Sequence, residues 1–303
     1  MVRAVDAALP SYDSLPVVEG APPGSSWGMW GEGDVFGCLN LLTPERVLAG
    51  AGSVRKGLVF SLNLELELPG PPLFRRAAFR HLVLGEGFGH DDMLDGWNTQ
   101  SSSQWDGFRH VGNPDHGFYN GVADEDHGMH HWARRGIAGR AVLVDIGRYR
   151  QLRYDEADPI LAEELLACID QQGTAFEAGD VLLVRTGWVG WYRSLDPSQR
   201  AALVDNLACP GLQPSEEMLR TLWDLHPAAV AVDNPAVEVW PPTPFFMHRS
   251  LLPLLGIPLG ELWDLEGLAV DCASDGRYDC LLTSAPLNVE GGVASPPNAL
   301  ALR

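Results

Sequence analysis

Four polar residues with even spacing lie between positions 100 and 110 of this 303-residue chain. Gln100, Gln104, Asp106 and His110 form a Gln-x3-Gln-x-Asp-x3-His string. Side chains of an extended segment alternate between two faces, so Gln100, Gln104 and Asp106 would project from the same side. A continuous helix would place Gln104 and Asp106 about 200° apart and would unite only Asp106 with His110. We therefore predict a strand or loop that becomes helical near Asp106.

The string offers two amide oxygens, one carboxylate and one imidazole, a set that suits a divalent cation and the water bound to it. The same residue types in a Ser-rich loop also cap turns and form hydrogen bonds with the backbone. The spacing alone leaves both interpretations open.

The string resembles the His-x-Gly-Thr-His-x-Asp-x3-His motif of the metal-dependent cyclase family, whose members include kynurenine formamidase and isatin hydrolase. Other segments resemble the same family in the same order along the chain. They are residues 30–45, 136–145, 179–188 and 232–238, and then His248 followed by Gly260 and Glu261.

In that family the first two histidines and the aspartate of the motif bind a metal, and a second metal, where present, uses the last histidine with a downstream His and Glu. By this resemblance Asp106 and His110 match the motif, and His248 and Glu261 match the downstream pair. The two glutamines stand where the family usually has histidine. This version resembles the branch that contains trans-dienelactone hydrolase, which opens an unsaturated lactone. The predicted metal ligands are therefore Gln100, Gln104, Asp106, His110, His248 and Glu261.

The ligand cluster and the resemblance together predict a metal-dependent hydrolase that opens a cyclic ester (a lactone) or a cyclic amide. The cation, manganese or zinc, would acidify a bound water and polarise the substrate carbonyl, and neutral amide ligands favour manganese. His110 would be the general base, because the ordinary pKa of histidine lies close to working pH. Glu261 would be the second catalytic residue, which orients that base or holds a second ion with His248.

Two alternatives remain at this stage. The site could serve a cyclase, isomerase or lyase that acts on a small intermediate without attack by water. The chain could also be a non-catalytic small-molecule binding protein in which the glutamines have abolished metal binding.

Composition predicts one globular domain over residues 1–303, because 46% hydrophobic content supports a large core and no linker divides the chain. A net charge of −19 would repel nucleic acid and anionic membranes, so we expect a small-molecule substrate as partner. Positive charge for an anionic substrate could come from Arg80, Arg109 or Arg185. The family resemblance suggests a homodimer or larger assembly.

A cytoplasmic location is expected. The first ten residues lack an apolar segment of signal-peptide length, and no run of 18 apolar residues occurs. The five cysteines include no Cys-x2-Cys pair, which favours reduced, mostly buried thiols.

The hydrophobic pattern predicts an alternating strand at residues 57–68 and buried strands at 140–146, 180–185 and 228–232. Capping residues and acidic first turns predict helices at 158–168, 214–225 and 246–255. This order favours an α/β domain with a mixed sheet. The resemblance implies a swivelling β/β/α fold, with a mixed sheet or barrel-like core flanked by helices.

Three other motifs compete for a function. Residues 24–28 spell Gly-x-Ser-x-Gly, but prolines precede them where a nucleophile elbow needs a strand. Residues 85–89 are glycine-rich, but acidic residues follow them, which favours a turn over a nucleotide loop. Residues 127–131 hold three histidines, and we expect a polar loop there because adjacent histidines cannot share a face. Trp105 and Trp132 could hold a planar ring or pack in the core.

Overall fold

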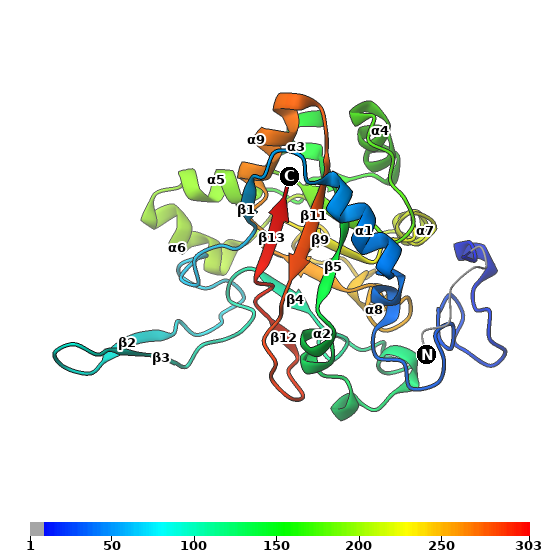
Figure 1. The fold of residues 1–303 in the computed structure, drawn as a ribbon, viewed down its shortest axis with the longest axis horizontal. Helices are drawn as coiled ribbons and strands as arrows, with labels where there is room; N and C mark the ends of the chain where they lie inside the picture. Colours follow the sequence, from blue (N-terminus) through cyan, green and yellow to red (C-terminus); the bar gives the residue numbers. More distant parts are fainter. Residues whose placement is uncertain (1–8) are drawn as a thin grey trace.

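The computed structural model describes residues 9–303 and contains one nine-stranded sheet with helices around it (Figure 1). Strands β5, β7, β9 and β10 are parallel, and the pairs toward both edges are antiparallel. The predicted α/β fold with a mixed sheet flanked by helices is thus confirmed. In sheet order the strands are β1 (Val59–Ser61), β13 (Ala299–Leu302), β11 (Asp279–Ser284), β5 (Ile137–Asp145), β7 (Val181–Arg185), β9 (Ala229–Val232), β10 (Leu259–Glu261), β4 (Gln104–Asp106) and β12 (Ala294–Ser295).

The three predicted buried runs form the centre of this sheet as β5, β7 and β9. All four residues of β9 are buried, as are the last five of β5 and the first four of β7. Parallel strands that are covered on both faces are expected to read as continuous apolar runs, which is why the sequence identified them.

The strand predicted at residues 57–68 is shorter than expected. Only β1 has strand geometry, although Leu62 and Leu64 continue the alternation by being buried. The backbone N–H of Leu64 donates to the hydroxyl of Ser103 at 2.8 Å, so it does not continue the ladder. The pattern therefore predicted the buried face correctly and the length of the strand wrongly.

Helices surround the sheet, and α1 packs on β5 and β11 (Figure 1). The helix predicted at 214–225 is confirmed as α7, where the Ser215 hydroxyl accepts a hydrogen bond from the N–H of Met218 at 3.1 Å. The helices are α1 (Pro44–Ser53), α2 (Met129–Arg135), α3 (Ile146–Tyr149), α4 (Ala162–Gln172), α5 (Trp188–Ser194), α6 (Pro197–Asn206), α7 (Glu216–Asp224), α8 (His248–Leu251) and α9 (Glu266–Asp275), with 3-10 turns at Tyr12–Ser14, Gly37–Leu41, Tyr119–Gly121 and Asp124–Asp126.

Two helix predictions need correction. Residues 159–160 form the short strand β6 (Pro159–Ile160), paired with β8 (Gly211–Leu212), and α4 begins only at Ala162. The carboxylate of Asp158 does not cap a helix, because it accepts hydrogen bonds from Arg150 and Arg153. The helix predicted at 246–255 is reduced to α8, and turns follow it.

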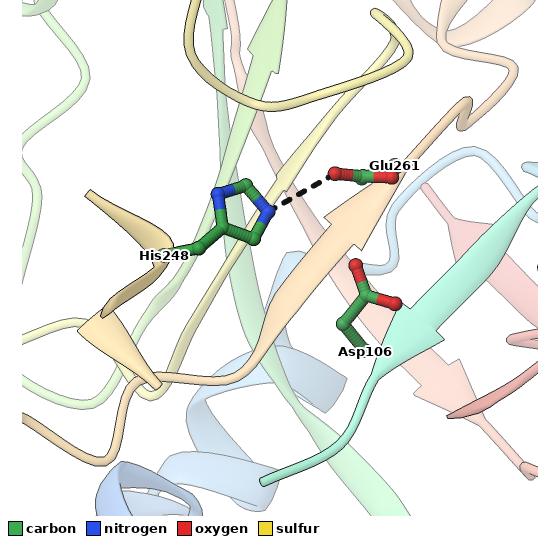
Figure 2. A group of neighbouring side chains, drawn as sticks. All are labelled: Asp106, His248 and Glu261. Carbon is green, nitrogen blue, oxygen red and sulfur yellow. Dashed lines mark hydrogen bonds and ion pairs between the residues drawn. The ribbon is translucent and has the colours of Figure 1, made fainter. Parts of the chain in front are cut away.

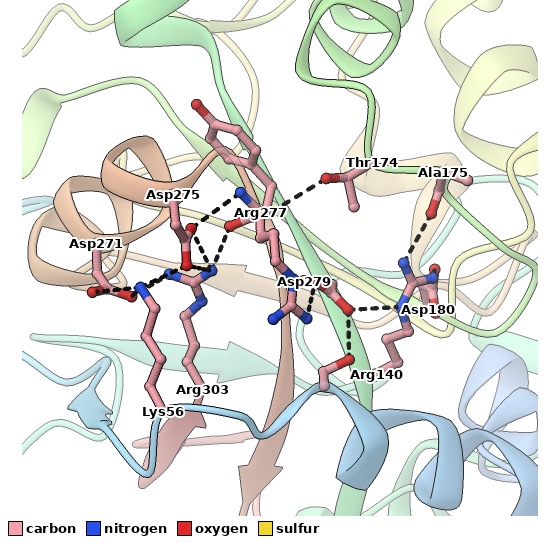
Figure 3. A network of polar contacts seen from close by, with 12 residues as sticks. Lys56, Arg140, Thr174, Ala175, Asp180, Asp271, Asp275, Arg277, Asp279 and Arg303 are labelled. Carbon is pink, nitrogen blue, oxygen red and sulfur yellow. Dashed lines mark hydrogen bonds and ion pairs between the residues drawn. The ribbon is translucent and has the colours of Figure 1, made fainter.

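A polar network ties the ends of several strands to α9 (Figure 3). Arg303 is 2% exposed and donates to both carboxylate oxygens of Asp275, at 2.9 and 3.1 Å, and Lys56 pairs with the same carboxylate at 2.6 Å. Nearby, Arg140 of β5 donates to the buried Asp180 at 2.7 Å. Pairing of this kind reduces the free-energy cost of burying charged groups.

Among the described residues, no helix is both long and apolar enough to cross a membrane. The five cysteines are buried free thiols, as predicted. Residues 1–8, which carry most of the signal-peptide argument, lie outside the described residues.

Candidate metal centre

The candidate site is built on the antiparallel pair β4 and β10. Gln104 and Asp106 project from one face of β4, and Trp105 points to the other face, where its ring packs against Trp263 at 4.7 Å. The register places Glu261 of β10 opposite Gln104. The Gln104 amide accordingly donates to Glu261 Oε2 at 2.5 Å. The predicted extended geometry is confirmed for residues 104–106 and is wrong for Gln100, which lies in a turn where its N–H donates to Asn98 Oδ1 at 2.8 Å.

The predicted change to a helix near Asp106 is wrong. A turn follows β4, closed by a hydrogen bond of 2.9 Å from the N–H of His110 to the carbonyl of Gly107. This turn still returns His110 toward Asp106, with its Nε2 at 3.9 Å from Asp106 Oδ1.

Three buried side chains converge at the centre of the site (Figure 2). One potential ligand atom from each of Asp106, His248 and Glu261 lies within 4.8 Å of the others. Their exposures are 0%, 2% and 5%, and His248 Nε2 is 3.2 Å from Glu261 Oε1. Burial and the charge of Asp106 together raise the pKa of Glu261 well above its usual range, although His248 acts against them.

Two oxygens in this cluster have no hydrogen-bond partner within residues 9–303. They are Oδ2 of Asp106 and Oε1 of Gln104, and both are buried. A buried acceptor without a donor costs about 1–3 kcal/mol, and more if it is charged. Oxygen acceptors left open beside a histidine and a second carboxylate are the donors that a divalent cation takes, so the residues present fit a bound metal.

Gln100 makes a different contact from the one predicted. Its amide nitrogen, not its oxygen, faces the cluster, and donates to Asp106 Oδ1 at 2.7 Å and to His110 Nδ1 at 3.1 Å. Gln100 therefore links Asp106 to His110. The His110 side chain is 27% exposed, and partial burial lowers its pKa despite the nearby Asp106.

The structure thus brings all six predicted site residues into one connected cluster. It also adds Glu238, which sequence reasoning did not select. The fully buried Glu238 accepts from His248 Nδ1 at 2.7 Å and from the backbone N–H groups of His248 and Met247 at 3.1 and 2.9 Å. Although burial lowers the pKa of His248, contact with Glu238 and Glu261 raises it overall. A carboxylate on one ring nitrogen fixes the orientation of the other, which here faces Glu261.

Phe246 and Arg76 complete the surroundings. The Phe246 ring stacks on His248, with centroids 4.6 Å apart and planes inclined by 6°. Arg76 donates to the carbonyl of Gln100, and its charge lowers the pKa of Glu261. No carboxylate within residues 9–303 lies within 4 Å of its guanidinium. The sequence signal for Glu238 was its place in the family-like segment 232–238, and Arg76 had no signal.

The other candidate groups lie outside this cluster. Arg80, Arg109 and Arg185, suggested as partners for an anionic substrate, pair with carboxylates of their own chain. Trp105 and Trp132 are buried in the core at 0% and 2% exposure.

The three competing sequence motifs also lie outside this cluster. Residues 24–28 lie in turns, and residues 85–89 form the tip of a hairpin. The polar loop predicted at residues 127–131 is only partly right, because Met129, His130 and His131 form the first turn of α2. The rings of the adjacent histidines His130 and His131 also lie 4.0 Å apart, so the expectation that they would point to different faces is wrong. Within the described part of the chain, the only group found with metal-ligating geometry is the central one of Asp106, His248 and Glu261.

Comparison with known proteins identifies the family of this fold. The model of the Cyclase family, described as "Putative cyclase", matches residues 65–239. A crystal structure described as a novel cyclase is 32% identical, covers 92% of this chain and 99% of its own, and has a TM-score of 0.84. No curated protein sequence matches the chain.

Two more distant structures share the fold. Isatin hydrolase A from Labrenzia aggregata, bound to benzyl benzoate, is 16% identical over 85% of this chain and 97% of its own, with a TM-score of 0.57. A structure described as a potential metal-dependent hydrolase with cyclase activity is 14% identical over 80% and 98%, with a TM-score of 0.51.

Proposed function

The chain belongs to the cyclase family, and from this premise we propose that it is a metal-dependent hydrolase that opens a cyclic ester or a cyclic amide. The proposal is supported by a buried cluster of carboxylate, imidazole and amide donors. Two structures with the same fold are described as an isatin hydrolase and a potential metal-dependent hydrolase with cyclase activity, and isatin hydrolase by its name acts on isatin, a cyclic amide.

The single observation that carries the proposal is the pair of buried oxygens without donors. Asp106 Oδ2 and Gln104 Oε1 would hold the cation together with His248 and Glu261. Three of these four residues supply oxygen and only one supplies nitrogen, which favours manganese, with zinc as the alternative. Glu238 would keep Nε2 of His248 directed at the ion.

When bound, the ion would acidify a water molecule and polarise the substrate carbonyl. The proton from that water would pass to His110, whose lowered pKa keeps it neutral and able to accept. Gln100 donates to Nδ1, which assigns the lone pair of the neutral ring to Nδ1. We therefore propose that Nδ1 accepts the proton, and that the hydrogen bond from the Gln100 amide to Nδ1 breaks when it does.

The first test is elemental analysis of untagged protein by plasma mass spectrometry. We expect about one equivalent of manganese or zinc in the wild type and almost none in Asp106→Ala. Asp115→Ala, which removes an exposed carboxylate from a loop, is the matched control and should keep the metal. Metal retained in Asp106→Ala, or absent from all three proteins after reconstitution, would overturn the proposal.

Turnover in heavy-oxygen water separates hydrolysis from cyclase, isomerase or lyase chemistry. Five- and six-membered lactones and cyclic amides would be screened, and the product analysed by mass spectrometry. Hydrolysis places one solvent oxygen in the new carboxylate, whereas ring closure or isomerisation places none there. An unlabelled product would therefore favour the alternative.

A further inference from the structure

One cation beside the candidate metal centre has no carboxylate partner in the described part of the chain. Arg76 lies just before the hairpin of β2 (Arg80–Leu84) and β3 (Asp91–Asp95), and its guanidinium donates to the carbonyl of Gln100. A guanidinium presents several N–H donors in a planar fork. No other acceptor within residues 9–303 forms a hydrogen bond with the guanidinium of Arg76. Most of its donors are therefore free to bind a ligand.

Arg76 is close enough to the site to affect its ionisable groups. Burial lowers the pKa of His110, and the charge of Arg76 lowers it further. Burial also raises the pKa of Glu261, and Arg76 is one of the charges that oppose this rise. The guanidinium still lies more than 4 Å from the carboxylates of Asp106 and Glu261. It therefore adds positive charge near the proposed ion without being neutralised in an ion pair.

The backbone that carries Arg76 is strained. Phe74 and Arg75 both have a φ of 57°, in the left-handed region that residues other than glycine seldom adopt. Such strain persists only where the surroundings hold it, and it is most frequent at sites that bind ligands. The ring of Phe74 makes a T-shaped contact with Trp240, with centroids 5.0 Å apart, and the N–H of Arg76 donates to the carbonyl of Leu73 at 3.2 Å. The guanidinium carbon lies 5.0 Å from the centroid of the Phe74 ring, so the side chain is held in place before a ligand binds.

The charge around Arg76 indicates which ligand it suits. In a chain of net charge −19, the buried carboxylates Asp106, Glu238 and Glu261 repel an anion unless a cation faces it. The guanidinium fork matches a carboxylate, which accepts two parallel N–H···O bonds. One guanidinium balances one negative charge, so a carboxylate is favoured over a doubly charged phosphate in these acidic surroundings.

We propose that Arg76 binds a carboxylate of the substrate, so that the enzyme opens lactones or cyclic amides that carry such a group on the ring. This inference rests on the proposed function and names the class of its substrate. Binding of the carboxylate at Arg76 would hold the ring beside the ligands of the ion. Arg76 would then determine specificity and would take no part in proton transfer.

Calorimetry on manganese-loaded protein with two matched pairs of probes tests the proposal. The first pair is pyroglutamate and its neutral amide, and the second is γ-butyrolactone with a carboxylate or a carboxamide on the ring carbon beside the ring oxygen. The wild type should bind each carboxylate about 10- to 100-fold more tightly than its amide, because charged hydrogen bonds form only with the carboxylate.

Two substitutions of Arg76 and one of its neighbour locate the effect. Arg76→Met should abolish the preference for carboxylates and keep the metal. Arg76→Lys retains the charge and loses the fork, so it should keep part of the preference. Arg75→Met is the matched control, because the Arg75 side chain is 83% exposed and pairs with Asp205 away from the site. It should bind both pairs as the wild type does.

Four results would overturn the proposal. They are no detectable binding of either carboxylate, equal affinity for both members of each pair, an equal loss in Arg75→Met, and a preference that survives in Arg76→Met. The last would mean that the ion and not Arg76 binds the carboxylate.

Turnover separates this inference from the function on which it rests. Hydrolysis of the carboxamides at the rate of the carboxylates would leave the proposed function in place and refute the role of Arg76. A preference for carboxylates that depends on Arg76, in a protein that hydrolyses no ring, would refute the function alone.

Discussion

Glu238→Gln is the most informative single change, because it keeps the shape of a buried side chain and removes only its charge. Glu238 Oε1 accepts both the backbone N–H and Nδ1–H of His248, and Oε2 accepts the N–H of Met247. A glutamine that keeps the two His248 contacts must point its NH2 group at the N–H of Met247. One buried N–H then loses its partner, which costs about 1–3 kcal/mol of folding free energy.

The effect on metal binding follows from the weaker hold on His248. The imidazole keeps a neutral acceptor on Nδ1 in place of a carboxylate, so its orientation toward Glu261 is less tightly fixed and its Nε2 is less basic. Loss of such a supporting contact typically weakens metal binding by about 10- to 100-fold, which corresponds to roughly 1.4–2.7 kcal/mol. We expect Glu238→Gln to fall in this range for manganese and zinc.

The assay is competition of apoprotein with a fluorescent chelator, alongside urea unfolding of the same samples. Glu261→Gln, which changes a proposed ligand directly, should lose more affinity than Glu238→Gln. Glu164→Gln is the control, because Glu164 caps α4 and pairs with Arg150, and no site residue is among its partners. Wild-type metal affinity in folded Glu238→Gln would refute the role given to this carboxylate.

Three further outcomes are expected. His110→Ala should lower turnover about 10²- to 10⁴-fold and keep the metal, and an equal loss of both would contradict its role as base. In Gly211→Ala the added Cβ would clash with the backbone of Glu238. Thermal melting should show a loss of about 1–3 kcal/mol in stability, and chelator competition should show weaker metal binding. Gly52→Ala, with open space around its Cβ, is the control and should be neutral or stabilising. Burial raises the pKa of Asp180 from 3.8 to about 6, although the N–H of Glu177 and the charge of Arg140 act against it. The protonated carboxyl is therefore favoured in the folded state, and its stabilising contribution is complete below the lower value and lost as pH rises through the upper one. Urea unfolding of the wild type relative to Asp180→Asn should show a decline of up to about 3 kcal/mol across that window, and parallel pH profiles would exclude it.

The even spacing of Gln104 and Asp106 was enough to predict their shared face, because side-chain alternation in a strand is a local property. The partners of these residues could not be found in this way. Glu261 lies opposite Gln104 only through the pairing of β10 with β4, which depends on the whole sheet. Resemblance to a family, and not periodicity, supplied Glu261 and His248.

The contacts of amides and carboxylates were the least predictable part of the site. A glutamine offers a donor and an acceptor at the same end, so the sequence did not reveal that Gln100 presents its NH2 group to Asp106. Asp158 reads as a helix cap beside a proline, but Arg150 reaches it through tertiary structure. Glu238 follows no helical or strand period relative to His248, and only the fold shows that they touch.

Charge balance accounts for the combination of residues at the centre. Asp106, Glu238 and Glu261 are three buried carboxylates. Arg76 has a favourable electrostatic interaction with two of them, Asp106 and Glu261. The raised pKa of His248 favours a protonated ring, and a bound ion would replace that proton and leave the ring neutral. A divalent ion would then bring this group to a net charge of zero, the condition under which buried charges are least costly. The amide oxygen of Gln104 is neutral, so it can bind the ion without making the net charge of the cluster negative again. Replacing Arg76 by Met should therefore leave the cluster one charge too negative and strengthen the binding of manganese and zinc in the chelator competition, and equal or weaker binding would contradict this charge balance.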